Sequence, residues 1–272
     1  MGKLYVVGTP IGNLGDISPR ALETLESVDF IAAEDTRVTL KLLNRFEIKK
    51  EMISYYEHNK GLKGDIIIDR ILKGETCALV SDAGMPAISD PGEDLVRVAH
   101  EMGVQVESVP GPTAVATALS ISGFSTGRFC FEGFLSVNKL SRKEHLEEIK
   151  NEKRTMVFYE APHKLLSTLK DMLNILGNRE IALVKELTKI HEDVFITTFE
   201  DAIKHYEAEP PKGEFVLIIK GATEEKAEYT LADAVRIAKG LMEKGESASV
   251  SAKEAAKITG IKKGDVYKEI LN

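Results

Sequence analysis

The chain of 272 residues has few of the features that mark secreted, membrane or zinc-binding proteins. Its two cysteines, Cys77 and Cys130, lie far apart and outside any Cys-x-x-Cys pattern, so neither a disulfide framework nor a zinc site is expected. No stretch approaches the roughly 18 consecutive apolar residues of a membrane helix. Met1 is followed almost directly by Leu4–Val7, which leaves no room for a signal peptide and no match to a myristoylation site. These features predict a cytoplasmic protein without membrane contact.

Several motifs of catalysis and nucleotide binding are also missing. The segment Gly8–Asn13 is neither a G-x-G-x-x-G fingerprint nor a phosphate-binding loop ending in Gly-Lys-Ser/Thr, which disfavours a dinucleotide dehydrogenase and a P-loop NTPase. The six histidines are scattered without a His-x-x-x-His pair, so we expect no metal site. No Ser-His-Asp arrangement can be argued.

The charge of the chain is acidic and unevenly distributed. A net charge of −7, from 36 Lys and Arg against 43 Asp and Glu, argues against a simple nucleic-acid coat protein. Residues 231–272 carry eight basic and six acidic side chains, so the C-terminal end is weakly basic whereas the rest of the chain is acidic. Both a specialised basic tail and ordinary solvated helices fit that count.

Short β-branched runs alternate with helical patterns, which is typical of an α/β sheet protein. A Gly-rich break at 123–127 separates two such sets, so we expect an N-terminal α/β domain at 1–122 and a second α/β domain at 123–222. Ser18 and Pro19 predict the start of the first helix. The expected strands are Leu4–Val7, Phe30–Ala33, Thr76–Val80, Val104–Val109, Thr155–Tyr159, Ile181–Lys185, Val194–Thr198 and Phe215–Ile219.

The C-terminal segment at 229–272 is predicted to be wholly helical. Ser251 and Glu254 have the spacing of a capping box, and Gly260 is a helix stop before a last helix at Asp265–Leu271. Two short helices around such a glycine resemble a helix-turn-helix, so an RNA contact is one interpretation of this segment and a plain helical pair is the other.

Three loops that follow expected strands are rich in Gly, Pro and Ser: 8–13, 81–92 and 110–114. Ligands bind beyond the carboxyl ends of strands in open α/β sheets. Glycine permits close approach of the backbone to a ligand, and proline stiffens a loop so that less entropy is lost on binding. Each loop alone could be a structural turn, but three in one domain predict a ligand site.

These loops resemble those of the tetrapyrrole-methylase superfamily of S-adenosylmethionine-dependent methyltransferases. Within this superfamily, the sequence segments resemble those of the branch that methylates the 2′-hydroxyl of a cytidine in small-subunit (16S) ribosomal RNA. The resemblance spans roughly residues 4–220. It rests on Gly8–Asn13 with Asp16, Ala33–Arg37, Tyr56–Asn59, Ser81–Gly92, Pro110–Ala114, Phe158–His163 and Lys185–Lys189.

The resemblance implies two α/β domains with the cofactor cleft between them, a small C-terminal helical segment, and S-adenosyl-L-methionine as cofactor. It also implies a homodimer acting on 16S ribosomal RNA within the small ribosomal subunit. Met85-Pro86-Ala87 lengthens the second loop relative to small-molecule members, which leaves the contacts between Gly84 and Ser89 open. Matched position by position to the family, the residues that the resemblance implies for cofactor binding are Pro10, Asp82, Ala83, Gly84, Ile88, Thr113, Ala114, Tyr159, Glu160 and Leu187.

A ribose hydroxyl is a poor nucleophile unless a group accepts its proton or stabilises the forming alkoxide. The catalytic candidates are therefore Glu34, Asp35 and Arg37 after the second strand, and His58 in the loop that begins with Tyr55 and Tyr56. The aromatic side chains of that loop could stack on an unpaired base. Helix capping by Asp35 and an ordinary polar loop around His58 are the competing interpretations.

Two other functions remain open from the sequence. One keeps the fold and cofactor but methylates a small tetrapyrrole, which would need neither the longer second loop nor the helical tail. The other is a non-catalytic RNA- or ribosome-binding module, against which the intact Asp82-Ala83-Gly84 string argues.

Overall fold

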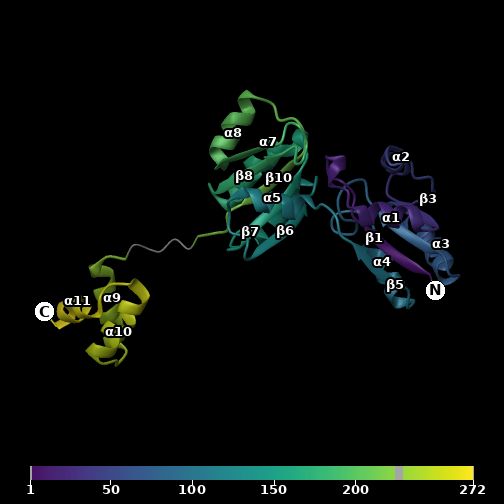
Figure 1. Ribbon diagram of the computed structural model, residues 1–272. Coiled ribbons are helices and arrows are strands. Elements are labelled where there is room, and N and C mark those ends of the chain that lie inside the picture. The colour runs from purple at the N-terminus through teal and green to yellow at the C-terminus, as the bar shows by residue number, and fades with distance from the viewer. Residues whose placement is uncertain (1, 224–228, 272) are drawn as a thin grey trace. The chain divides into compact units, whose positions relative to one another are not determined.

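The computed structural model describes residues 2–223 and 229–271. The chain forms two compact units, Met1–Ala222 (unit 1) and Thr223–Asn272 (unit 2). Unit 1 contains both β-sheets and unit 2 is helical (Figure 1). No helix in the described part is long and apolar enough to cross a membrane.

The first sheet of unit 1 is entirely parallel, with the strand order β3-β2-β4-β1-β5. The chain leaves β1 toward one side of the sheet and later adds β5 on the other side. The strand order therefore reverses beside β1, the kind of place where open α/β sheets bind ligands. The strands are β1 (Lys3–Val7), β2 (Phe30–Ala33), β3 (Glu51–Ser54), β4 (Thr76–Val80) and β5 (Gln105–Val109).

Both faces of this sheet are buried, which explains its nearly continuous apolar strands. Leu4 and Leu79 belong to one core with helices α3 (Lys60–Leu72) and α4 (Glu93–Glu101). Alternate residues belong to a second core with α1 (Pro19–Ser27) and α2 (Thr36–Arg45). As predicted, Ser18 caps α1: its Oγ accepts from the Ala21 amide at 3.1 Å, with Pro19 at the first position.

The second sheet has the order β6-β7-β10-β8-β9. Only β6 and β7 pair in parallel, and the other neighbours are antiparallel. Sequence patterning did not predict β6, because Gly133 (φ 64°) forms a bulge that interrupts its alternation. The strands are β6 (Phe129–Phe134), β7 (Thr155–Glu160), β8 (Glu180–Lys185), β9 (Asp193–Thr198) and β10 (Phe215–Ile219).

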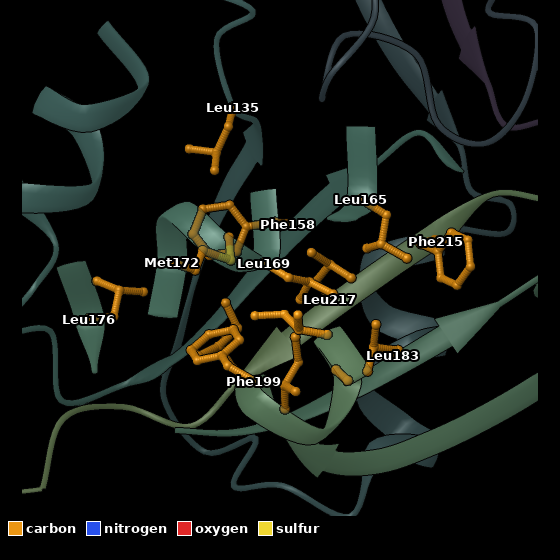
Figure 2. Close-up of a cluster of buried hydrophobic side chains, with 14 of the residues drawn as sticks. Leu135, Phe158, Leu165, Leu169, Met172, Leu176, Leu183, Phe199, Phe215 and Leu217 are labelled. Atoms are coloured by element: carbon orange, nitrogen blue, oxygen red, sulfur yellow. The ribbon is translucent and has the colours of Figure 1, made fainter. Parts of the chain in front are cut away.

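A large apolar core lies on one face of the second sheet, under α6 (Lys139–Glu148), α7 (Pro162–Leu176) and α8 (Phe199–Ala208) (Figure 2). Phe158 from β7 and Phe199 from α8 are fully buried in it. The opposite face is covered by α5 (Ala114–Ser122). Because α5 packs on the second sheet, this packing favours a domain boundary before α5; the division at 122/123 stays a prediction.

Unit 2 consists of α9 (Leu231–Glu243), α10 (Ala248–Thr259) and α11 (Lys263–Leu271) around a small core of mainly alanine side chains. The prediction that this segment is helical is confirmed, and Gly260 (φ 73°) ends α10 as expected. The predicted capping box at Ser251 is wrong. Ser247 caps α10 instead, and Ser251 is fully buried inside the helix. The capping box of this unit joins Thr230 and Asp233 at the start of α9.

Gly240 lies within α9, where an added Cβ would meet no atom within 4 Å. Replacing it with alanine reduces the entropy of the unfolded chain without a steric cost, so Gly240→Ala should stabilise unit 2 by about 0.5–1 kcal/mol. Thermal unfolding followed by circular dichroism measures this change. Gly260→Ala is the opposing control, because its positive φ penalises a side chain and should make that variant less stable.

Candidate cofactor and substrate site

The carboxyl ends of β2, β4, β1 and β5 lie next to one another in the first sheet. The three Gly- and Pro-rich loops and the Glu34–Arg37 segment follow these strands, so the topology gathers them along one edge. Thr9 and Gly84 form an antiparallel bridge, with amide-to-carbonyl distances of 2.9 and 3.1 Å. The first two loops are therefore joined directly.

The third loop contacts the first through two glycines. A Cβ on Gly8 would lie 2.7 Å from the backbone of Gly111 and 2.7 Å from Met85 Sδ. Only glycine fits such an approach of backbone to backbone. Thr113 then caps α5, accepting from the Ala116 amide at 3.3 Å, and Ala114 is the first helical residue.

The second domain reaches this edge through the segment after β8. Leu187 is 7% exposed and shares a core with Ile11 of the first loop. A Cβ on Gly12 would lie 2.9 Å from the Leu187 carbonyl oxygen and 2.7 Å from Thr188 Oγ1. That buried hydroxyl has no hydrogen-bond partner. Sequence reasoning did not single out Thr188.

Backbone strain concentrates in these loops. Ala87 (φ 64°), Glu186 (φ 51°) and Thr188 (φ 65°) are non-glycine residues in the left-handed region. Such conformations cost on the order of 1–3 kcal/mol each and persist where the surroundings enforce them, often at ligand sites. Ile88, beside Ala87, is an apolar side chain left 62% exposed. The second loop is thus strained and presents an uncovered apolar surface.

Glu34 and Asp82 link the ends of β2 and β4. Glu34 Oε2 accepts from the Asp82 amide at 3.3 Å, and Asp82 Oδ1 accepts from the Asp35 amide at 3.1 Å. Partial burial raises the pKa of Glu34, and the charges of Asp82, Asp90 and Asp35 raise it further. Partial burial likewise raises the pKa of Asp82 and of Asp90, a residue that sequence reasoning did not single out.

Asp35 and Arg37 form a different kind of pair. The Asp35 carboxylate caps α2 through the Arg37 amide at 2.8 Å and binds the Arg37 guanidinium, with Nη2 to Oδ2 at 2.6 Å. These hydrogen bonds lower the pKa of Asp35 to about 2. The Arg37 side chain is 87% exposed. Asp35 therefore caps α2 and also holds the exposed Arg37 side chain in place.

The loop around His58 is polar and exposed, but its two tyrosines differ. Tyr55 is 1% exposed and lies in the core, so it cannot stack on a base. Tyr56 is exposed and packs edge-on against His58, with ring centroids 6.2 Å apart. The Asn59 side chain holds the turn, accepting from the Tyr56 amide at 2.9 Å.

Tyr159 and Glu160, at the end of β7, point to different surroundings. The half-buried Tyr159 ring contacts Phe131 and Phe134, with centroids 4.9 and 5.4 Å away. Burial raises the pKa of its hydroxyl, which the Val115 backbone and the charge of Asp90 also influence. Glu160 is 4% exposed, and its carboxylate accepts from the Ala161 amide at 2.8 Å and from Thr168 Oγ1 at 2.5 Å. Its side chain is therefore committed to the start of α7.

A sequence model of the tetrapyrrole (corrin/porphyrin) methylases matches residues 3–203. The chain belongs to this family. A Synechocystis relative named ribosomal RNA small subunit methyltransferase I is 46% identical, over 98% of this chain and 96% of its own length. Relatives of the same name are 42% identical in Bacillus subtilis, over 98% of this chain and 93% of that protein, and 48% identical in Thermotoga maritima, over 81% and 99%.

Solved structures of proteins named for other activities share this fold. Uroporphyrin-III-C-methyltransferase from Thermus thermophilus matches with a TM-score of 0.58 at 20% identity, over 81% of this chain and 94% of that one. A diphthine synthase matches with a TM-score of 0.63 at 13% identity, over 82% and 91%. At such low identity these structures establish the fold alone.

A hollow of about 540 Å³ lies apart from the joined loops, lined by Glu132, His145, Glu152 and Arg154 among others. His145 Nε2 lies 2.9 Å from Glu132 Oε2, and Arg154 is paired with Glu152 at 2.7 Å. These side chains satisfy one another. Because these side chains are already paired, the joined loops are the better candidate for a ligand site.

Gly8→Ala tests the contact between the first and third loops. Its Cβ would force the backbone of Gly111 away, at a cost of about 1–3 kcal/mol. If the loops hold a ligand, affinity for S-adenosylmethionine should fall roughly 5- to 150-fold. Titration calorimetry measures it, with Gly127→Ala as the control because its added Cβ meets no atom within 4 Å. Equal affinities for wild type and Gly8→Ala would show that this contact does not shape the site.

Proposed function

We propose that the protein is an S-adenosylmethionine-dependent methyltransferase that modifies the 2′-hydroxyl of a cytidine in 16S ribosomal RNA. The observation that carries this proposal is the identity of 42–48% with relatives named ribosomal RNA small subunit methyltransferase I, several of them over nearly the whole chain. The ribose hydroxyl of cytidine is the finer part of the proposal and rests on the resemblance of the loop strings.

The joined loops suit the cofactor. Asp82 and Ala83 are exposed beside Gly84, whose positive φ (85°) turns the backbone where the first loop bridges it. Ile88 offers an uncovered apolar surface for an adenosyl group. Because the Glu160 carboxylate is held inside the second domain, that residue would contribute its backbone. The other proposed contacts are Pro10, Thr113, Ala114, Tyr159 and Leu187.

When bound, S-adenosylmethionine supplies a methyl group that already carries its leaving group. The chain must then align the ribose hydroxyl with that methyl group, an effect that can contribute about 7–11 kcal/mol. It must also accept the hydroxyl proton. Rigid loops joined by the Thr9–Gly84 bridge serve the first task.

Glu34 is the proton acceptor that the geometry favours. It is half-buried beside Asp82, and its raised pKa makes it a better base than an ordinary carboxylate. Asp35, with a pKa of about 2 and a bound Arg37, is a poor base. His58 is exposed and remains a candidate for a phosphate contact.

Arg37 and Tyr56 are the proposed RNA contacts near this edge. Arginine binds phosphate oxygens as a planar fork, and the Arg37 side chain is 87% exposed although its Nε and Nη2 bind Asp35. Tyr56 has an exposed ring that can stack on an unpaired base. Unpaired bases are the usual target of sequence-specific RNA recognition.

We further propose that the substrate is the small ribosomal subunit rather than free RNA, that the enzyme is a homodimer, and that it acts in the cytoplasm. The homodimer follows from the family resemblance. Light scattering of the purified protein tests it, and a monomer at micromolar concentration would contradict it.

The second candidate function is methylation of a tetrapyrrole, which the fold shared with uroporphyrin-III-C-methyltransferase favours. That match is 20% identical, whereas the ribosomal RNA methyltransferases are more than twice as similar. A non-catalytic ribosome-binding role is disfavoured because relatives that are 42–48% identical are named methyltransferases.

The deciding experiment offers labelled S-adenosylmethionine together with one of two acceptors. The acceptors are small ribosomal subunits from a strain lacking the methyl group, and uroporphyrinogen III. We expect label in the 16S RNA, on a ribose whose 3′ phosphodiester bond then resists alkaline hydrolysis. Label in the tetrapyrrole alone would overturn the proposal in favour of the second candidate, and cofactor binding without transfer to either acceptor would favour the non-catalytic role.

A further inference from the structure

Unit 2 is a separate folding unit with its own core and capped helices. Ala234, Ala238, Ala252, Ala255 and Val266 are all fully buried in it. Small side chains let the three helices approach closely, and this core shares no residue with the cores of unit 1. The core of unit 2 is therefore built from its own residues alone.

The lengths of the relatives are consistent with a self-contained unit 2. The Thermotoga maritima relative is matched over 221 residues, which is 99% of its own length but 81% of this chain. Unit 1 alone extends from Met1 to Ala222. A protein with the same name thus has no length left for a counterpart of unit 2. The Synechocystis relative, matched over 98% of this chain, does.

One face of unit 2 is basic. Ser249, Lys253 and Lys257 recur at every fourth residue of α10, so they lie on one side of the helix, and all are exposed. Lys263, from the start of α11, brings a third ammonium group to this face: its Nζ donates to Ser249 Oγ at 3.1 Å. We call Lys253, Lys257 and Lys263 the basic face.

The ammonium groups of the basic face are not neutralised by the protein. Within the described residues, none of the three lies within 4.0 Å of a carboxylate oxygen, whereas Arg236 on α9 is paired with Asp233 at 2.6 Å. Glu254 follows Lys253 but is half-buried and points about 100° around the helix. The exposed Val250 lies beside the lysines. The surface is thus cationic with an apolar neighbour, in a chain of net charge −7.

We propose that the basic face is a docking surface for the phosphate backbone of the RNA substrate, which adds affinity and takes no part in methyl transfer. The choice of RNA as the partner rests on charge complementarity, because three ammonium groups with no carboxylate oxygen within 4.0 Å among the described residues match a polyanion. This inference depends on the proposed function only for the identity of the RNA. It explains why a relative can lack the unit, because docking and chemistry are then separate tasks.

The test measures RNA binding directly and does not depend on methyl transfer. The full-length Lys253→Ala/Lys257→Ala/Lys263→Ala variant is compared with wild type for binding to small ribosomal subunits and to protein-free 16S RNA, at 50 and 200 mM KCl. Each phosphate contact contributes about 0.7–0.9 to the slope of log K against log salt. Wild type should therefore lose about 20- to 40-fold more affinity between the two salt concentrations than the variant does.

The control variant removes the same charge elsewhere in unit 2. Lys239→Ala/Lys244→Ala/Lys268→Ala changes three other exposed lysines, and its salt slope should stay close to that of wild type. Cofactor binding by calorimetry shows that unit 1 is intact in both variants. For the basic-face variant, methyl transfer should show a KM raised about tenfold or more with kcat unchanged.

Three outcomes would overturn the inference. These are equal salt slopes for wild type and the basic-face variant, an equal loss in the control variant, and binding of wild type to subunits but not to protein-free RNA, which would indicate a ribosomal protein as partner. Failure of the proposed function looks different. Methyl transfer would then be absent, while RNA binding and its dependence on the basic face would persist.

Discussion

Glu34→Gln is expected to lower kcat for methyl transfer by about 10²–10⁴-fold, the usual contribution of a general base. Glutamine keeps an oxygen that can accept from the Asp82 amide, now at 3.3 Å, but it cannot take the ribose proton. The loop therefore keeps its shape, and cofactor affinity and the KM for RNA should change little. Single-turnover transfer of labelled methyl groups to small subunits measures the effect.

Two other variants make this result specific. Glu23→Gln changes an exposed glutamate within α1, outside the joined loops, and should leave kcat unchanged. Asp35→Asn keeps an oxygen that can cap α2 but removes the negative charge that pairs with Arg37, so it should raise the KM for RNA more than it lowers kcat. A Glu34→Gln enzyme with wild-type kcat would remove Glu34 from the mechanism.

The pH dependence follows from the raised pKa of Glu34, whose ordinary value is 4.5. Activity should rise with pH as Glu34 loses its proton, at a pH above that value, and Glu34→Gln should lack this limb. The contribution of Glu34 to folding stability, in contrast, falls as the pH rises. A carboxylate whose folded pKa is raised contributes stability below its ordinary pKa and loses it as pH rises through the folded pKa.

At neutral pH the ionised Glu34 therefore opposes folding, since it lies half-buried near Asp82, Asp90 and Asp35. Urea unfolding should show Glu34→Gln more stable than wild type at pH 7, with a gap that closes as the pH falls through the raised pKa of Glu34 toward its ordinary value of 4.5. A gap that widens toward acid pH would mean that the ionised form is favoured in the fold.

Phe199→Ala is expected to lower the free energy of unfolding by about 3–5 kcal/mol. Phe199 is fully buried at the start of α8, within the core that α7 and α8 form over the second sheet (Figure 2). Its removal leaves a cavity among side chains held between the second sheet and two helices, so little collapse is possible. Denaturant unfolding at constant pH measures the change.

Leu140→Ala is the matched truncation for this experiment. Leu140 lies on α6 beside the same core but is 65% exposed, so its loss should cost no more than about 0.5 kcal/mol. A Phe199→Ala variant that loses less than 1.5 kcal/mol would mean that the cavity fills, as happens where neighbouring side chains can move.

Much of the site edge could be predicted from the sequence, because its signals are local. Glycines and prolines at strand ends mark loops wherever the strands lie, and the order of the first sheet then brings those ends together. The cap at Thr113 and the pairing of Asp35 with its own helix are equally local. Their roles toward cofactor and RNA stay predictions.

Features that depend on tertiary contacts could not be predicted. Tyr55 and Tyr56 are adjacent and identical in type, and only the packing of α3 decides that the first is buried. The direction of the Glu160 carboxylate depends on Thr168, which lies eight residues further along the chain in α7. At the start of α10, Ser247 and Ser251 both precede suitable residues, but Ser251 is fully buried within the helix and Ser247 is the cap.

The contacts that join the loops also set the order in which the site can form during synthesis. The Gly8–Asn13 segment leaves the ribosome early, yet its partners Gly84, Gly111 and Leu187 follow much later in the chain. A nascent chain that ends before β8 has the strands of the first sheet but lacks the wall that Leu187 provides. A ligand stabilises only the state that binds it. Cofactor binding can therefore stabilise the newly made protein only late in synthesis, after nearly all of unit 1 has emerged.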